Sequence, residues 1–504
     1  MKKFSLPRSF YNWTSMAGAT LALISLFMIV FLFVISLIFD QGGSYLGLFI
    51  FIVLPVFLVI GLLFIPIGMY FQHRKTKQIK STPEKTWPVF DLNQKPTRNA
   101  TMIFGIGSLF FLLLSAVGSY EAFHFTESVE FCGTICHKVM KPEYVAYQHS
   151  SHARVACVDC HVGSGADWYV RSKLAGLYQV YAVTAGVYPK PIPTPVRNLR
   201  PARETCEECH WPDQFYGRKM VIERHFLPDE ENSEWDIYLQ MKIGPKHRAH
   251  GLQEGIHWHI NPDVKVEYIS TDRERQVIPW VRYTNLSTGE MHIFEDEDNK
   301  IPVSELASHE IRTMDCMDCH NRPSHDYKTP VRFINNAITA GQIPRELPDI
   351  KYLAMEILGR DYPTTDSAMR TIESEINEYY AMMYEDIYTG NYAMIEQAIT
   401  GIQSEFGKNM FPEMKVKWNV YHNNIGHLEF NGCFRCHNDK HSTPKGRIIS
   451  MDCNLCHNII GQGLADTLRV GSIFDQYEFI HPNDPNQAWK DKFCVDCHWD
   501  LYQQ

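Results

Sequence analysis

Cysteine and histidine recur together along the chain in a short, fixed pattern. Six segments read Cys-x-x-Cys-His, and a seventh has one extra residue between its cysteines. Two thiols at this spacing can form thioethers with the two vinyl groups of one haem, and the histidine that follows is then held as an axial iron ligand. The pattern therefore predicts seven covalently bound haem c groups and uses all 14 cysteines. In chain order, the predicted attachment cysteines and axial histidines are Cys132, Cys136 and His137; Cys157, Cys160 and His161; Cys206, Cys209 and His210; Cys316, Cys319 and His320; Cys433, Cys436 and His437; Cys453, Cys456 and His457; and Cys494, Cys497 and His498.

Zinc sites and disulfides also use paired cysteines, but they explain less of this pattern. Structural zinc does not need a histidine directly after every pair. Disulfides within the pairs would close very small loops and leave the seven histidines unexplained. We therefore interpret the cysteines as haem attachment sites.

Further histidines are needed as sixth iron ligands if the haems only carry electrons. Sixteen histidines remain beyond the seven in the motifs. His257 and His259 would point to one face if their segment is a strand, and we expect one of them to be a ligand. The last three motifs are flanked by four histidines, which we expect to supply three distal ligands: His422, His427, His441 and His481.

Three apolar stretches lie in the N-terminal quarter, at residues 17–39, 46–71 and 102–120. None contains a charged residue, and each is long enough to cross a hydrocarbon core of roughly 30 Å as a helix. The first stretch is longer than the apolar core of a signal peptide, and no small-x-small cleavage site follows it cleanly. We therefore predict three transmembrane helices, the first of them an uncleaved anchor.

Charge predicts the orientation of these helices. Lysine and arginine gather before the first span and in the loop 72–100, whereas residues 40–45 have none. The positive-inside rule then places the N-terminus and the basic loop in the cytoplasm, and everything after residue 120 in the periplasm. Residues 1–100 carry a net charge of +7 and the remainder −16. An acidic exported part favours basic or metal-bearing partners and argues against nucleic acid.

The predicted fold class is three transmembrane α-helices plus a loop-rich, mostly α multihaem cytochrome c domain with a small β-rich insertion. We expect a membrane anchor at 1–120, a four-haem region at 121–330 with the β-rich insertion at 215–310, and a helical region with a three-haem domain at 331–504. Short β-branched or aromatic runs separated by turn residues predict strands at 219–226, 235–243, 265–270, 277–284 and 290–294. Apolar stripes at helical spacing predict two amphipathic helices within 366–408, and 166–184 also has a helical pattern.

Residues 121–330 resemble the NapC/NirT/NrfH family of membrane-anchored tetrahaem quinol dehydrogenases. The matches are Cys-His-Lys-Val-Met at 136–140, a histidine at 152 just before the second motif, and His-Asn-Arg-Pro-Ser-His at 320–325. The resemblance implies that Met140 is an axial ligand of the first haem. It also implies that His152 ligates the fourth haem and that His325 reaches back to the second.

The same resemblance implies a quinol pocket near the first haem. Lys173, twelve residues after His161, stands where the family has a lysine in this pocket. The acidic partner of some members has no counterpart in the stretch 180–183, so we consider Asp167 beside Lys173 as a group that positions or deprotonates quinol. The family usually has one anchor helix and four haems. Three spans and seven motifs look more like the heptahaem inner-membrane quinol dehydrogenases that feed extracellular electron transfer.

We therefore predict that the chain oxidises menaquinol and passes electrons to periplasmic c-type cytochromes in anaerobic or extracellular respiration. Two other functions remain open. The chain could be a relay subunit without its own quinol site, or a terminal reductase of nitrite or hydroxylamine, which would need an iron with an open or atypical position. A homo-oligomer or a membrane partner subunit is compatible with the sequence.

Overall fold

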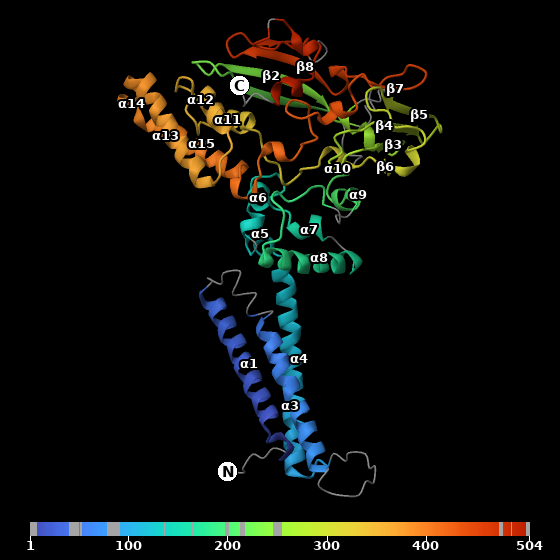
Figure 1. Ribbon diagram of the computed structural model, residues 1–504, viewed down its shortest axis with the longest axis vertical. Helices are drawn as coiled ribbons and strands as arrows, with labels where there is room; N and C mark the ends of the chain where they lie inside the picture. The colour runs from blue at the N-terminus through green and yellow to red at the C-terminus, as the bar shows by residue number, and fades with distance from the viewer. Residues whose placement is uncertain are drawn as a thin grey trace. The chain divides into compact units, whose positions relative to one another are not determined.

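The computed structural model describes residues 8–39, 50, 53–77, 91–135, 137–162, 166–196, 201–211, 217–244, 255–472, 477–484 and 486–499. The chain divides into two compact units (Figure 1). Unit 1 comprises Met1–Met140 with Ala156–Val158, and unit 2 comprises Lys141–Val155 with Asp159–Gln504.

Unit 1 contains the three predicted apolar helices. They are α1 (Trp13–Phe39), α3 (Leu54–Lys77) and α4 (Lys95–Glu127), and the short α5 (Val129–Thr134) follows. Each of the three long helices includes a stretch apolar enough to cross a membrane, of 20, 22 and 23 residues respectively. The three spans predicted from hydropathy are thus present as helices. The predicted start of the second span, Leu46, lies outside the described residues.

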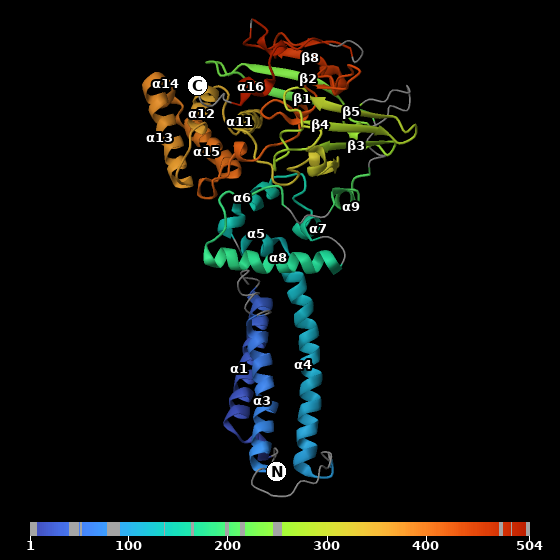
Figure 2. The same cartoon turned by 45° about the vertical axis from the view of Figure 1, so that its right-hand side comes forward.

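Helices α1 and α3 lie side by side in both views (Figures 1 and 2) and approach closely through small residues. A Cβ added to Gly18 would lie 2.6 Å from the Gly61 carbonyl oxygen, and one added to Gly61 would lie 2.7 Å from the Ala22 nitrogen. The Ser15 hydroxyl, fully buried, donates a 2.8 Å hydrogen bond to the Ile65 carbonyl. Small residues with an interhelical hydrogen bond are typical of helix pairs in lipid, where no hydrophobic effect drives association.

Two antiparallel sheets form the β part of unit 2. The first has the order β1-β2-β8-β9 and the second the order β6-β3-β4-β5-β7. Their bounds are β1 (Arg218–Phe226), β2 (Glu234–Lys242), β3 (Val264–Ile269), β4 (Trp280–Asn285), β5 (Met291–Asp296), β6 (Arg312–Thr313), β7 (His441–Ser442), β8 (His457–Leu464) and β9 (Arg469–Val470).

The five strands expected in the insertion are present, but they do not form a separate layer. Strand β8, from the sixth cysteine motif, pairs with β2, and β7 pairs with β5. Both sheets therefore contain strands from before and after residue 330. The C-terminal motifs are held by the same sheets as the earlier ones.

A helical layer with its own apolar core lies beside the first sheet (Figure 2). Ile372 and Ile376 of one predicted stripe and Ile395 and Ile402 of the other are fully buried in this core. Met383 of the first predicted stripe is instead 60% exposed, whereas the last residue of that stripe, Ile387, packs against the core. The layer consists of α11 (Pro330–Thr339), α12 (Ile350–Leu358), α13 (Thr365–Met383), α14 (Glu385–Gly390) and α15 (Tyr392–Asn409).

Short helices carry most of the cysteine motifs. They are α6 (His137–Gln148), α7 (Cys157–His161), α9 (Ala202–Cys206), α10 (Cys316–Cys319) and α16 (Cys494–His498), while η8 (Gly432–Arg435) and η9 (Cys453–Leu455) are 3₁₀-helices. The helix α8 (Ala166–Ala185) matches the pattern at 166–184.

The segment with His257 and His259 is the 3₁₀-helix η4 (Ile256–Ile260). It is not a strand, so the condition under which both histidines would point to one face is not met. Gly255 before it has a φ of 122° and passes so close to the Gly244 carbonyl that no Cβ would fit. This glycine conformation turns the chain out of the extended state.

Candidate haem sites

Unit 2 brings six motif histidines face to face with six histidines from elsewhere in the chain. In each pair the two ring centroids are 5.9 to 6.2 Å apart. The pairs, with the motif histidine first, are His161 and His325, His210 and His152, His320 and His257, His437 and His259, His457 and His427, and His498 and His481.

This separation fits an iron held between two imidazoles. A metal–nitrogen bond of about 2 Å on each side, plus the distance from that nitrogen to the ring centre, gives about 6 Å between centroids. Ring pairs without a metal cover a wider range, about 4.5 to 7 Å, whereas all six pairs lie close to the separation that two ligands of one iron would have. The donors present therefore fit six haem irons with two histidine ligands each.

Hydrogen bonds orient several of these rings through Nδ1. His257 Nδ1 lies 2.8 Å from the Ile243 carbonyl and His259 Nδ1 lies 3.0 Å from the Ile256 carbonyl. His437 Nδ1 lies 2.9 Å from the Ser450 carbonyl. Since a carbonyl only accepts, Nδ1 carries the proton in each of these rings and Nε2 is the unprotonated nitrogen. A fixed tautomer of this kind is the usual support of a metal-bound histidine.

The same contacts fix two histidines close to the first motifs. His325 Nδ1 donates to the Glu143 carbonyl and His152 Nδ1 to the Pro323 carbonyl, each over 3.1 Å. Thus the loop 320–325 and the end of α6 support each other's ligands.

Burial keeps many of these imidazoles neutral, as a metal ligand must be. It lowers the pKa of His259 to about 4, with smaller contributions from the charges of His437 and His257. It also lowers the pKa of His325 to about 4, where His161 and Arg322 add to the effect. Burial likewise lowers the pKa of His457 to about 4. These rings are uncharged at neutral pH.

The pairing differs from several of the expectations. His325 faces His161 of the second motif, as the resemblance implied, but His152 faces His210 of the third motif rather than a histidine of the fourth. His257 and His259 each have a partner of their own, where one ligand was expected.

Two histidines expected near the last motifs have other contacts. His441 is fully buried, with Nδ1 2.9 Å from Asn438 Oδ1 and Nε2 2.7 Å from the Ile278 carbonyl. Both of its ring nitrogens are used within the protein. His422 Nδ1 lies 3.1 Å from Glu274 Oε2, and its ring stacks on Trp499 at 6.0 Å. His259, from within the insertion, lies beside His437 of the fifth motif.

A buried carboxylate fastens the fourth motif to the second sheet. Asp318, between the two cysteines of the motif, is only 2% exposed. It accepts hydrogen bonds from Tyr268 of β3 at 2.6 Å, Arg312 of β6 at 2.8 Å and Arg275 at 3.0 Å. Asp315 completes the anchor by capping α10. A buried carboxylate that accepts several hydrogen bonds fixes the orientation of the segment that carries it.

Charged residues also join successive motifs. Arg435, inside the fifth motif, donates to the carbonyl of Asp318 in the fourth at 2.8 Å. Lys242 of β2 donates through Nζ to the Asn454 carbonyl in the sixth motif at 2.5 Å. Sequence reasoning missed these roles, although a charged residue enclosed by two attachment cysteines is a visible signal.

The attachment thiols of consecutive motifs are neighbours. Cys206 and Cys316, of the third and fourth motifs, share a hydrogen bond that raises the pKa of the Cys206 thiol, and the charge of Cys160 in the second motif adds to the rise. Burial raises the pKa of Cys319 to about 12, with a contribution from Cys433 of the fifth motif.

The same relation continues to the end of the chain. Burial raises the pKa of Cys456 to about 11, and the nearby charge of Cys433 contributes. Burial also raises the pKa of Cys494 to about 11, and Cys453 contributes there. The second to seventh motifs therefore follow one another in space in the order in which they occur in the sequence.

The first motif and the quinol residues are described only in part. Cys132 lies in α5 and Met140 in α6, whereas Cys136 and the side chain of His137 lie outside the described residues. Lys173 is half-buried on α8, and the side chain of Asp167 on the same helix lies outside the described part.

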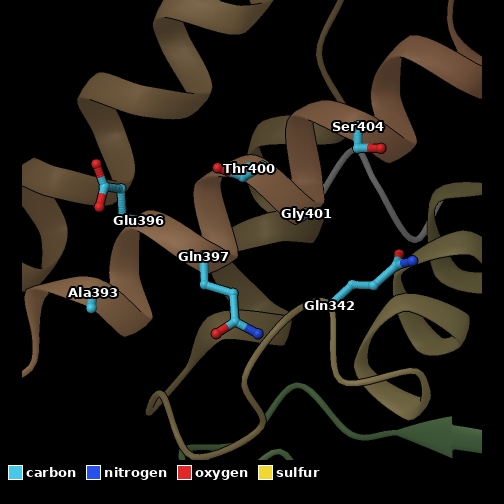
Figure 3. A pocket seen from close by; sticks show the side chains of 7 residues that line it. All are labelled: Gln342, Ala393, Glu396, Gln397, Thr400, Gly401 and Ser404. Atoms are coloured by element: carbon cyan, nitrogen blue, oxygen red, sulfur yellow. The ribbon is translucent and has the colours of Figure 1, made fainter.

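A separate pocket of about 550 Å³ lies in the helical layer (Figure 3). It lies along α15, and its lining comes from that helix and from Gln342. The lining residues are small or polar and contain no histidine or cysteine: Gln342, Ala393, Glu396, Gln397, Thr400, Gly401 and Ser404. This pocket therefore does not belong to the haem sites.

The comparisons with known proteins identify the family of the chain. The sequence profile of the NapC/NirT cytochrome c family, N-terminal region, matches residues 94–191. Cytochrome c-type protein ImcH of Geobacter sulfurreducens is 41% identical over 491 residues, which cover 97% of this chain and 95% of ImcH. Cytochrome c-type protein NrfH of Wolinella succinogenes is 31% identical over 115 residues, which cover 22% of this chain and 63% of NrfH. No solved structure matches the chain. The chain therefore belongs to the NapC/NirT family of membrane-anchored multihaem c-type cytochromes, electron-transfer proteins that bind haem c covalently.

Proposed function

We propose that the chain is a heptahaem quinol dehydrogenase, which oxidises menaquinol at the outer face of the cytoplasmic membrane and passes the electrons to periplasmic c-type cytochromes. Bound haem c supplies one-electron redox chemistry at each motif. The six histidine pairs carry the proposal. They offer two protein ligands at six motifs and so leave no open position for a substrate such as nitrite there.

We propose His325, His152, His257, His259, His427 and His481 as the sixth ligands of the second to seventh haems, in that order. His437 of the fifth motif is thus assigned to His259, in place of His422 or His441. For the first haem, His137 and Met140 remain the proposed ligands. The neighbouring thiols of the second to seventh motifs support transfer between these six haems in sequence order.

The quinol site is proposed from the family resemblance of α8. Lys173 or Asp167 would hold the quinol hydroxyl and accept a proton as the quinol is oxidised. The basic loop at 72–100 supports a cytoplasmic N-terminus and therefore proton release on the periplasmic side. The −16 charge of residues 101–504 favours an acceptor with a basic rim.

Anaerobic reduction by quinol tests the proposal. The purified full chain in lipid nanodiscs is mixed with a reduced menaquinone analogue, and the haem absorption bands are followed in time. We expect Lys173→Gln to slow reduction by about tenfold or more, because a positioned proton acceptor typically contributes that much. Lys219→Gln, at an exposed position on β1, is the matched control and should reduce at the wild-type rate.

The other two functions give different results in the same experiment. A relay subunit would not be reduced by quinol but would be reduced by a partner protein. A terminal reductase would be reoxidised rapidly by nitrite or hydroxylamine after chemical reduction. Either result would replace the dehydrogenase proposal.

A further inference from the structure

Helix α8 presents an apolar stripe that is exposed. The stripe consists of Val170, Leu174, Leu177, Tyr178 and Tyr181, which are 54%, 61%, 68%, 66% and 60% exposed. Their spacing of three and four residues places them on one face of the 20-residue helix. Scattered apolar side chains are common on protein surfaces, but a continuous stripe of this length marks an interaction surface.

The other side of α8 is not exposed in the same way. Ala182 is buried, and Ser172 and Ala175 are half-buried. The helix therefore has one covered side of small residues and one open side of large apolar residues. No residue in the described part of the chain covers the open side.

The residues flanking the stripe indicate the chemistry of that occupant. By helical position, Arg171 lies along one side of the stripe and Lys173 along the other. The Arg171 guanidinium lies 5.3 Å from the centre of the Trp168 ring, and Lys190 Nζ lies 5.7 Å from that of Tyr188. Tryptophan and tyrosine with lysine or arginine beside an apolar face are the composition of the lipid headgroup region. The chain is itself membrane-anchored, and α8 starts 39 residues after the end of α4 at Glu127.

We propose that α8 lies in the membrane interface, with its apolar stripe among the lipid acyl chains and its basic residues at anionic headgroups. This contact is a second attachment of the chain to the bilayer, made by unit 2 and separate from the three spans. It does not depend on the proposed quinol oxidation.

Thiol labelling tests the lipid contact. The full haem-loaded chain with Leu177→Cys is placed, one chain per disc, in nanodiscs of phosphatidylethanolamine and phosphatidylglycerol, and a water-soluble maleimide is added. Haem attachment occupies the native cysteines as thioethers, so the introduced thiol is the reactive one. Val303→Cys is the control, since Val303 is 83% exposed at a site far along the chain. We expect Cys at 177 to react about tenfold more slowly than Cys at 303; equal rates would overturn the proposal.

A photo-crosslinker identifies what covers the stripe. p-Benzoylphenylalanine in place of Leu174 is irradiated in the same single-chain discs, and the adduct is identified by mass spectrometry. An adduct with phospholipid supports the proposal, whereas an adduct with another segment of the chain overturns it. Haem content per chain, read from the absorption spectrum, verifies that each variant is assembled. Neither readout requires quinol, so its outcome is separate from that of the reduction experiment.

Discussion

The two histidines of η4 are separated by a single residue, yet they face two different motifs. In a 3₁₀-helix, residues i and i+2 point in different directions, so His257 reaches His320 while His259 reaches His437. The local sequence indicated a ligand in this segment. It could not show that there are two, because the partners lie far along the chain and the strand assumption placed both rings on one side.

The cysteines and the motif histidines could be predicted because their spacing is local chemistry. The distal histidines could not be assigned in this way, since any histidine after the third apolar helix was a candidate. His441 shows the difficulty: it follows His437 of the fifth motif by only four residues, but both its nitrogens are hydrogen-bonded in the protein interior. His259, in contrast, has a carbonyl at Nδ1, and its ring centroid lies 5.9 Å from that of His437.

Substituting these two histidines should separate a ligand from a structural residue. We expect His259→Gln to convert one haem to the high-spin state, because one iron loses its sixth ligand, and to allow carbon monoxide to bind when the protein is reduced. His441→Gln should leave the haems low-spin. Electron paramagnetic resonance of the oxidised protein and carbon monoxide difference spectra measure both. A high-spin signal from His441→Gln alone would reverse the assignment.

At the scale of elements, segments with a clear local pattern could be predicted and a fully buried strand could not. The strands β1 to β5 contain β-branched and aromatic runs separated by turn residues, and α13 and α15 carry apolar stripes. Strand β8 reads His-Asn-Ile-Ile-Gly-Gln-Gly-Leu and has no alternation, because its central residues are buried on both faces. Gly461 in this strand lies under Tyr238 of β2, where a Cβ would be only 2.7 Å from the ring. Two glycines made the segment look like a loop.

The α1–α3 pair gives a prediction at the same scale. Gly61→Leu places a large side chain against Gly18 and Ala22, so we expect the two helices to separate and the chain to unfold several degrees lower in nanodiscs. Gly105→Leu on α4 is the matched control, since nothing lies within 4 Å of where its Cβ would be. Thermal unfolding followed by far-ultraviolet circular dichroism measures both. Equal losses would show that close packing at Gly61 does not hold the pair together.

For the whole molecule, one buried network links the helical layer to the first sheet. Lys351 of α12 donates through Nζ to Asn335 Oδ1 at 2.8 Å and to the Val331 carbonyl at 3.3 Å. The Asn335 amide nitrogen lies 3.4 Å from Nδ1 of His225 on β1. Complete burial lowers the pKa of Lys351 to about 7. Burial, with the charge of Lys351 second, lowers the pKa of His225 to about 4.

Stability should therefore depend on pH through Lys351. Its pKa is lower when folded than when unfolded, so the folded state is favoured most when the amine is neutral, and stability is lost as pH falls from about 10 to about 7. We expect the unfolding temperature of the wild type to rise by several degrees across this range as pH rises, and that of Lys351→Met to rise less. The exposed Lys300→Met is the control and should follow the wild type. Parallel curves for wild type and Lys351→Met would contradict the role of the buried amine.

The pairing of β2 with β8 sets a requirement on biosynthesis. Strand β2 ends at Lys242, but its partner is complete only when the ribosome has passed Leu464. Until then the β1–β2 hairpin has an unpaired edge, which is a template for aggregation. A chain that stops after Cys436 and His437 would keep the edge permanently, so the segment that begins with the sixth motif contributes to the solubility of unit 2 as well as to its cofactor content.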